Sequence, residues 1–301
     1  MNPLHIAIKQ KTKVTKALES LYNVTYYQEQ TFLQKLLLKD KQYPDIYFLQ
    51  GSVNTNSLDF VENSKLTIVN SKKIKEQILD KKSYLNEKKI EVLYPYLTNK
   101  SEHNKEIKKA FKKQYNIDKE LVVILFSAKD VIKNGIDKFI EIILHLENKN
   151  YKLIFDITSK DKELVITKLK KSKIFEKSLV FTEYENQDEL FIIGDIFILP
   201  TKLQLFAPTV LKAMYLKNIV FVERNNAASE LIDSFSLILG QDDRSIYFKI
   251  DSLLSNLKEI KKIQKENSLV VKNMKFEKYM EELQENINFH LSKDSSSTRD
   301  F

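Results

Sequence analysis

The chain has 301 residues, of which 43% are hydrophobic, and a formal net charge of +8, so it is long enough for two domains with buried cores and is not a disordered polymer. It has no cysteine and only four histidines, which excludes disulfides and thiolate metal sites and leads us to expect no metal. Its four glycines lie far apart, which excludes both the G-x-G-x-x-G dinucleotide motif and the Walker phosphate loop.

Short apolar segments alternate with amphipathic ones over the first hundred residues. Such β-α-β alternation predicts a parallel sheet with helices on its faces. The expected strands are Leu4–Ile8, Val24–Gln28, Pro44–Leu49, Leu66–Val69 and Ile90–Leu93. The expected helices are Lys13–Leu21, Thr31–Asp40 and one that starts over Ile74–Leu79.

A polar segment, Ser101–Tyr115, is expected to be a helix that opens a second unit, so we place a domain boundary near residue 100. After it the alternation resumes, with the continuous apolar runs of central parallel strands. The expected strands are Leu121–Phe126, Tyr151–Phe155, Ser178–Phe181, Asp195–Leu199 and Ile219–Val222. The expected helices are Ile136–Leu146, 161–172, 187–193, 209–216, Leu253–Gln264 and Phe276–Phe289.

These elements predict an α/β protein in four parts. The parts are a reduced Rossmann-like domain (1–100), a larger Rossmann-like domain (101–275), a C-terminal helix that crosses back to the first domain (276–291) and a polar tail (292–301).

The positive charge is concentrated in the first part of the chain. Residues 1–118 hold 21 lysines against 13 Asp and Glu, a net +8, whereas residues 119–301 hold 28 basic and 28 acidic residues. A basic first domain is suited to an anionic membrane surface or a lipid-linked acceptor, although solvated lysines also explain it. Only three residues are arginines, and no arginine-rich aromatic stripe is present, so nucleic acid is not an expected partner.

No apolar run approaches the roughly 20 residues needed to cross a bilayer, and Met1–Lys16 lacks the apolar core of a signal peptide. We therefore expect a cytoplasmic protein, with peripheral contact to the inner face of the membrane as an open alternative.

Four landmarks in the second half fall in a recognisable order. The first strand is followed by Lys129, Lys133 and Gly135-Ile-Asp137. The others are Glu189–Pro200, then Phe206–Met214, and finally Ala228–Ile232 with Glu230 in an acidic position. Together they resemble the nucleotide-sugar-binding domain of the family-four glycosyltransferases. That resemblance implies the GT-B fold, in which two Rossmann-like domains face a cleft.

The resemblance also implies a set of site residues. Lys129 and Lys133 match an arginine and a lysine that hold the donor diphosphate, and Gly135 follows them. Gln204 stands where the family has the glutamate beside the donor sugar, and Lys212 stands where a second glutamate accepts hydrogen bonds from the nucleotide ribose. Glu230 completes the expected set. A nucleoside-diphosphate sugar is the implied donor substrate, and no cofactor is implied.

The departures from the family pattern leave two hypotheses open. Lysine replaces arginine, neither glutamate is present, and the segment after Ile8 lacks the family's glycine-rich loop. One hypothesis is a degenerate, non-catalytic or weakly active relative that acts as a binding or scaffold subunit with a protein partner or as a homo-oligomer. The alternative is an active retaining glycosyltransferase that moves a hexose to a surface-glycan or lipid-linked acceptor.

Overall fold

The computed structural model describes residues 3–9, 11–27, 43–98 and 101–296. The chain divides into two compact units, Met1–Tyr96 with Met274–Phe301, and Leu97–Asn273. The boundaries expected from the sequence, after residues 100 and 275, lie four and two residues beyond these divisions. No helix in the described ranges is both long enough and apolar enough to cross a bilayer.

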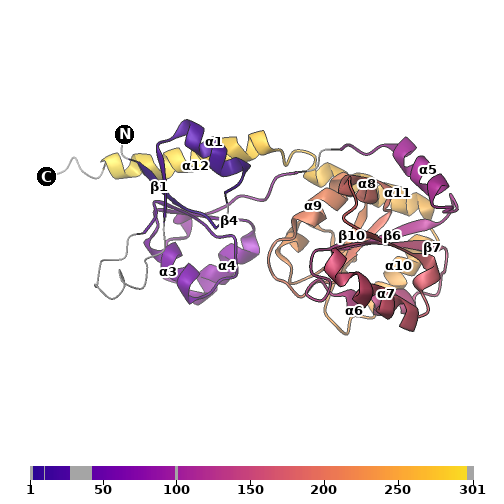
Figure 1. Ribbon diagram of the computed structural model, residues 1–301. Coiled ribbons are helices and arrows are strands. Elements are labelled where there is room, and N and C mark those ends of the chain that lie inside the picture. Colours follow the sequence, from indigo (N-terminus) through magenta and orange to yellow (C-terminus); the bar gives the residue numbers. More distant parts are fainter. Residues whose placement is uncertain (1–2, 10, 28–42, 99–100, 297–301) are drawn as a thin grey trace. The chain divides into compact units, whose positions relative to one another are not determined.

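The first unit contains a five-stranded parallel sheet with strand order β2-β1-β3-β4-β5. Its strands are β1 (Leu4–Ala7), β2 (Val24–Tyr26), β3 (Ile46–Phe48), β4 (Leu66–Val69) and β5 (Ile90–Val92). Its helices are α1 (Lys13–Leu21), α3 (Thr55–Asn63), α4 (Lys72–Lys81) and α12 (Phe276–Ser296). Helices α1 and α12 cover one face of this sheet, and α3 and α4 cover the other (Figure 1).

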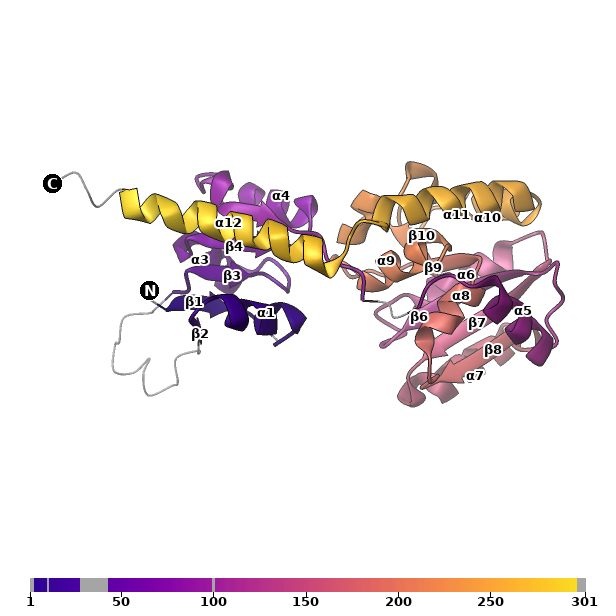
Figure 2. The same ribbon diagram turned by 90° about the horizontal axis from the view of Figure 1, so that it is seen from above.

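The C-terminal helix α12 completes the core of the first unit. Its side chains Met280, Leu283 and Ile287 are buried with residues of β1, β3, β4 and α1. Figure 2 shows α12, in yellow, crossing the strands that it covers. The helix runs to Ser296, so five residues expected in the polar tail belong to it.

Sequence patterns missed one helix of the first unit, and one helix that they predicted cannot be compared with the structure. Helix α3 was not expected, although Asn54 caps it by accepting a hydrogen bond from the Ser57 N–H at 2.9 Å. The helix expected at Thr31–Asp40 lies outside the described residues.

The second unit contains a six-stranded parallel sheet with strand order β11-β10-β9-β6-β7-β8. Its strands are β6 (Val122–Ala128), β7 (Tyr151–Ile157), β8 (Ser178–Thr182), β9 (Ile196–Leu199), β10 (Ile219–Glu223) and β11 (Leu237–Ile238). Its α-helices are α5 (Lys105–Gln114), α6 (Ile136–His145), α7 (Lys162–Lys171), α8 (Gln187–Ile193), α9 (Pro208–Tyr215), α10 (Ser245–Leu254) and α11 (Leu257–Val271). The expected α/β class with two parallel sheets is confirmed.

Helices cover both faces of the second sheet, as a buried parallel sheet requires. Helices α5, α8, α9 and α11 lie on one face, and α6, α7 and α10 lie on the other (Figure 1). The single helix expected at Leu253–Gln264 is wrong, because α10 ends at Leu254 and α11 begins at Leu257. An N-cap explains the break: the Asn256 side chain accepts a hydrogen bond from the Glu259 N–H at 3.2 Å.

Candidate functional site

The order of strands in the second unit singles out one edge of its sheet. The chain leaves β6 toward β7 on one side, and β9 later pairs with β6 on the other side. In doubly wound sheets, ligands bind at the carboxyl ends of strands where the strand order reverses in this way. The loops that follow β6, β9 and β10 therefore form the candidate functional site.

Lys129 and Lys133 lie in the loop after β6, and both side chains are exposed. The Lys133 ammonium lies 3.3 Å from the Asp130 carboxylate, but its side chain is 68% exposed, so solvent screens this pair strongly. The Lys133 N–H donates to the Asp130 carboxylate and lowers the pKa of that carboxyl. The Lys133 carbonyl accepts a hydrogen bond from the Thr201 hydroxyl at 3.2 Å, which ties this loop to the one after β9.

Gly135 is held against the end of β9. Its φ of +83° is in the left-handed region, and a Cβ at this position would lie 2.1 Å from the Pro200 carbonyl oxygen. Only glycine permits both this conformation and this close approach. Gly135 is therefore explained by packing at the start of α6.

Gln204 lies in the loop after β9, with an exposed side chain. Its carbonyl accepts a hydrogen bond from the Ala227 N–H at 2.9 Å. The Asn226 side chain donates to the carbonyls of Leu203 at 2.8 Å and Leu205 at 2.6 Å. These bonds join the β9 loop to the loop after β10, so hydrogen bonds connect all three loops at this edge.

Lys212 lies on α9, and its charge is already engaged. The ammonium is 2.7 Å from the Asp188 carboxylate on α8 and 5.5 Å from the centroid of the Phe191 ring. The side chains of Lys212 and Asp188 are only 20% and 8% exposed. Asp188 also accepts a hydrogen bond from the Ser101 N–H at 3.1 Å, which fixes the carboxylate that faces Lys212.

Glu230 lies on a short 3₁₀ helix, Ala227–Leu231, and is half-buried. It lines a cavity of about 770 Å³ between this segment and helices α10 and α11. Asp233, Glu259 and Glu266 also line this cavity. The other predicted site residues are not part of its lining.

Two buried carboxyls at the same sheet edge were not among the predicted site residues. Asp156 in β7 accepts a hydrogen bond from the Ser127 hydroxyl in β6 at 2.7 Å. Burial raises the pKa of Asp156, while the Ser127 hydrogen bond and the charge of Lys212 act in the opposite direction. A signal for it exists in the sequence, because an acidic residue interrupts an apolar strand run.

Glu223 is the second of these carboxyls and the last residue of β10. Its Oε2 atom is buried and has no hydrogen-bond partner within the part of the chain that the structure describes. Burial, followed by the charge of Asp243, raises its pKa. In the same described part of the chain, no three His, Asp or Glu side chains are grouped so that they could hold a metal ion.

Comparison by sequence gives no match to any protein-family model or to any curated protein. Comparison with solved structures does give matches. A glycosyltransferase from Rickettsia africae ESF-5 is similar with a TM-score of 0.72 and 15% identity, over 96% of this chain and 77% of that one. The Anabaena protein HepE in complex with UDP is similar with a TM-score of 0.73 and 10% identity, over 96% of this chain and 100% of that one.

WaaG, a glycosyltransferase involved in lipopolysaccharide biosynthesis, is similar with a TM-score of 0.68 and 10% identity, over 93% of this chain and 98% of that one. The chain has the GT-B glycosyltransferase fold. At these identities the likeness concerns the fold, and activity has to be argued from the residues of the site.

Proposed function

We propose that this chain is a degenerate relative of the family-four glycosyltransferases that acts as a binding or scaffold subunit, with weak or no transferase activity. The GT-B fold supports a common origin with nucleotide-sugar-binding proteins. The residues at the candidate site support the loss of activity, because their charges differ from those that the resemblance implies.

The ion pair between Lys212 and Asp188 carries this proposal. At the Lys212 position the resemblance implies a glutamate that accepts hydrogen bonds from the ribose hydroxyls. An ammonium group has three donors and no acceptor, and here it is held at 2.7 Å by a carboxylate on α8. A ribose would have to compete with an internal ion pair. Breaking this pair would leave two largely buried charges without a partner and poorly solvated.

Gln204 gives independent support. At its position the resemblance implies a carboxylate beside the donor sugar, and a neutral amide cannot offset positive charge that develops on the sugar. The loss of such charge stabilisation slows turnover by orders of magnitude.

The active alternative is favoured by one observation. Lys129 and Lys133 are exposed at the sheet edge where ligands bind in this class of fold, and the protein HepE has been crystallised with UDP-glucose and with UDP and glucose. On this alternative, the chain transfers a hexose from a nucleoside-diphosphate sugar to a surface-glycan or lipid-linked acceptor.

Hydrolysis of UDP-glucose and GDP-glucose separates the two functions without knowledge of the acceptor. We expect the wild-type chain to release nucleoside diphosphate at, or only slightly above, the uncatalysed rate. Turnover that a Lys129→Ala/Lys133→Ala variant abolishes, and that a Lys258→Ala control on α11 keeps, would contradict the proposal and support the active alternative.

A scaffold also requires a partner. We propose that the chain forms a stable complex with another protein or with a second copy of itself. We also propose an anionic membrane surface as a further contact of the basic first 118 residues. The mass of the native protein, measured by light scattering after mild purification, tests the first part: a lone monomer would count against it.

A further inference from the structure

A second cavity of the second unit lies at the opposite edge of its sheet from the candidate site. Leu121 and Val122 line it at the start of β6, Asp195 lines it just before β9, and α5 and α11 supply its walls. Its volume is about 600 Å³, which is in the range of small-molecule sites. The seven residues of β6 separate the two edges by about 20 Å, so this cavity is distinct from the candidate donor site.

Positive charge dominates the lining of this cavity. Seven lysines line it, against two acidic residues, Glu120 and Asp195. This is a local concentration, because residues 97–273 as a whole hold 30 basic and 25 acidic residues. Like charges so close together repel one another unless an anion lies between them.

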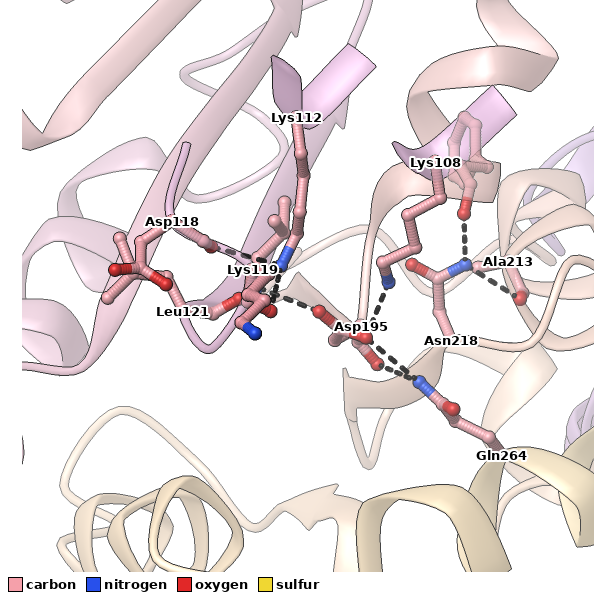
Figure 3. Close-up of polar contacts among 11 residues, drawn as sticks. Lys108, Lys112, Asp118, Lys119, Leu121, Asp195, Ala213, Asn218 and Gln264 are labelled. Carbon is pink, nitrogen blue, oxygen red and sulfur yellow. Dashed lines mark hydrogen bonds and ion pairs between the residues drawn. The ribbon is translucent and has the colours of Figure 1, made fainter. Parts of the chain in front are cut away.

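Asp195 neutralises only one lysine of this cluster, Lys108, because the rest of its hydrogen-bonding capacity is already used. One oxygen accepts the Lys108 ammonium at 2.6 Å, and the other accepts the Val123 N–H at 2.9 Å. The Gln264 side chain donates to the Asp195 carbonyl at 3.2 Å (Figure 3). Asp195 is thus a fixed link between α5, α11 and the start of β6.

Lys112 is a buried cation in the wall of the cavity. It is only 9% exposed, and its ammonium donates to the carbonyls of Lys119 at 2.9 Å and Leu121 at 2.7 Å (Figure 3). No carboxylate lies within ion-pair distance of it in the described chain. Burial lowers the pKa of Lys112, and the more distant charge of Asp195 acts in the opposite direction.

Five further lysines of the lining are exposed and form no ion pair with any residue that the structure describes. These are Lys105, Lys119, Lys217, Lys261 and Lys265. His103, which also lines the cavity, has a buried Nδ1 atom without a hydrogen-bond partner in the described ranges. The cavity therefore offers several exposed ammonium groups to a ligand, with the half-buried His103 ring beside them.

We propose that this cavity binds a polyanion through two or more of its phosphate groups, either a soluble polyphosphate or the phosphorylated headgroup of a lipid. Lysine is a common phosphate ligand in proteins. The lining contains neither an arginine nor an aromatic ring other than that of His103, so it recognises phosphate charge and offers little to a nucleobase. This binding does not depend on the proposed function.

Calorimetric titration of the full chain with sodium tripolyphosphate tests the proposal. We expect wild-type binding at low salt that a Lys261→Gln/Lys265→Gln variant weakens by about tenfold or more, the effect of losing one charge-assisted hydrogen bond. The matched control, Lys113→Gln/Lys258→Gln, removes two exposed lysines that do not line the cavity and should change the affinity by less than about twofold. Equal weakening in both variants, or no wild-type binding, would overturn the proposal.

Proton NMR of the histidine rings gives a second readout. Burial lowers the pKa of His103, and the charges of Lys217 and Lys108 lower it further. A bound polyanion should shift the His103 ring signals and raise the pKa of His103. The ring signals of His145 on α6, which does not line the cavity, should not shift. Tripolyphosphate binding that leaves the His103 ring signals unchanged would place the anion elsewhere and contradict the proposal.

Vesicles that contain phosphatidylinositol bisphosphate, whose headgroup carries several phosphates, distinguish the two sources of phosphate. Vesicle binding that tripolyphosphate displaces, and that the Lys261→Gln/Lys265→Gln variant loses, identifies a lipid headgroup. Tripolyphosphate binding without vesicle binding identifies a soluble anion.

Discussion

Replacement of Lys212 by glutamate would place two carboxylates next to each other between α8 and α9. We expect Lys212→Glu to lower the free energy of unfolding of the second unit by about 3 kcal/mol, because it leaves the buried Asp188 carboxylate without its cation. The exchanged pair, Asp188→Lys/Lys212→Glu, should recover most of this loss. Urea denaturation measures both values, and an exchanged pair no more stable than Lys212→Glu would show that the ion pair contributes little.

Asp156 should make the stability of the second unit depend on pH. Its pKa is raised by burial in the folded state, so at pH values between the ordinary value and the raised one the folded chain holds a proton that the unfolded chain has lost. Stability therefore falls as pH rises through this window. Asp156→Asn removes this cost and still accepts the Ser127 hydrogen bond.

The melting temperatures of Asp156→Asn and the wild type, measured from about pH 4 to about pH 8, check this sign. We expect the advantage of the variant to grow as the pH rises from about 4, near the ordinary carboxyl pKa. An advantage that stays constant or shrinks with rising pH would contradict the assigned direction of the pKa.

Gly135 should not tolerate a side chain. Gly135→Ala combines a left-handed backbone with a Cβ placed 2.1 Å from the Pro200 carbonyl oxygen, so we expect a loss of at least about 2 kcal/mol in thermal or urea unfolding. Gly51→Ala is the control, because a Cβ there meets nothing within 4 Å and the change should stay within about 0.5 kcal/mol. Similar losses in both variants would refute this explanation of Gly135.

At the scale of elements, α12 should be essential to the first unit. Leu283 is fully buried in the core formed by the first sheet, and truncation there leaves a cavity. We expect Leu283→Ala to lower the free energy of unfolding of the first unit by about 2–5 kcal/mol, and the exposed Glu281→Ala to change it by less than about 0.5 kcal/mol. Hydrogen exchange of the β1 and β3 amides would report the difference, and unchanged protection in Leu283→Ala would contradict the packing.

Elements with strong apolar periodicity could be predicted from sequence, and those defined by caps could not. The runs at β6, β7 and β9 and the one-faced helix α6 are evident from local pattern alone. Helix α3 has little more than Leu58 and Val61 on its buried face, so its main signal is the Asn54 cap. The break between α10 and α11 likewise depends on the cap at Asn256, inside a pattern that continues across it.

The candidate site was predictable only where local sequence positions it. Lys129, Lys133 and Gln204 lie within five residues of a strand's end, so parallel-sheet topology places their loops at one edge. Asp188, the partner of Lys212, lies on a different helix, and only tertiary packing brings the two together. The same is true of the lysine-lined cavity, whose walls come from α5 and α11.

At the scale of the whole molecule, the two units differ in how the chain builds them. The second unit is one continuous segment, Leu97–Asn273, whereas the first is completed by residues that follow Asn273. We expect residues 97–273 to fold alone with a cooperative thermal transition, and residues 1–96 to remain unfolded until a peptide of residues 274–301 is added. Circular dichroism tests both statements, and an independently folded 1–96 fragment would contradict the role assigned to α12.

The central claim is that the position implied for ribose binding is occupied by an internal ion pair. Calorimetric titration of UDP into the wild type and into Asp188→Lys/Lys212→Glu tests it most directly, because the exchange restores a carboxylate at residue 212 and keeps the pair. We predict that the exchange strengthens UDP binding by about tenfold or more, as a regained charge-assisted hydrogen bond would. Tight wild-type binding that the exchange weakens would contradict the claim.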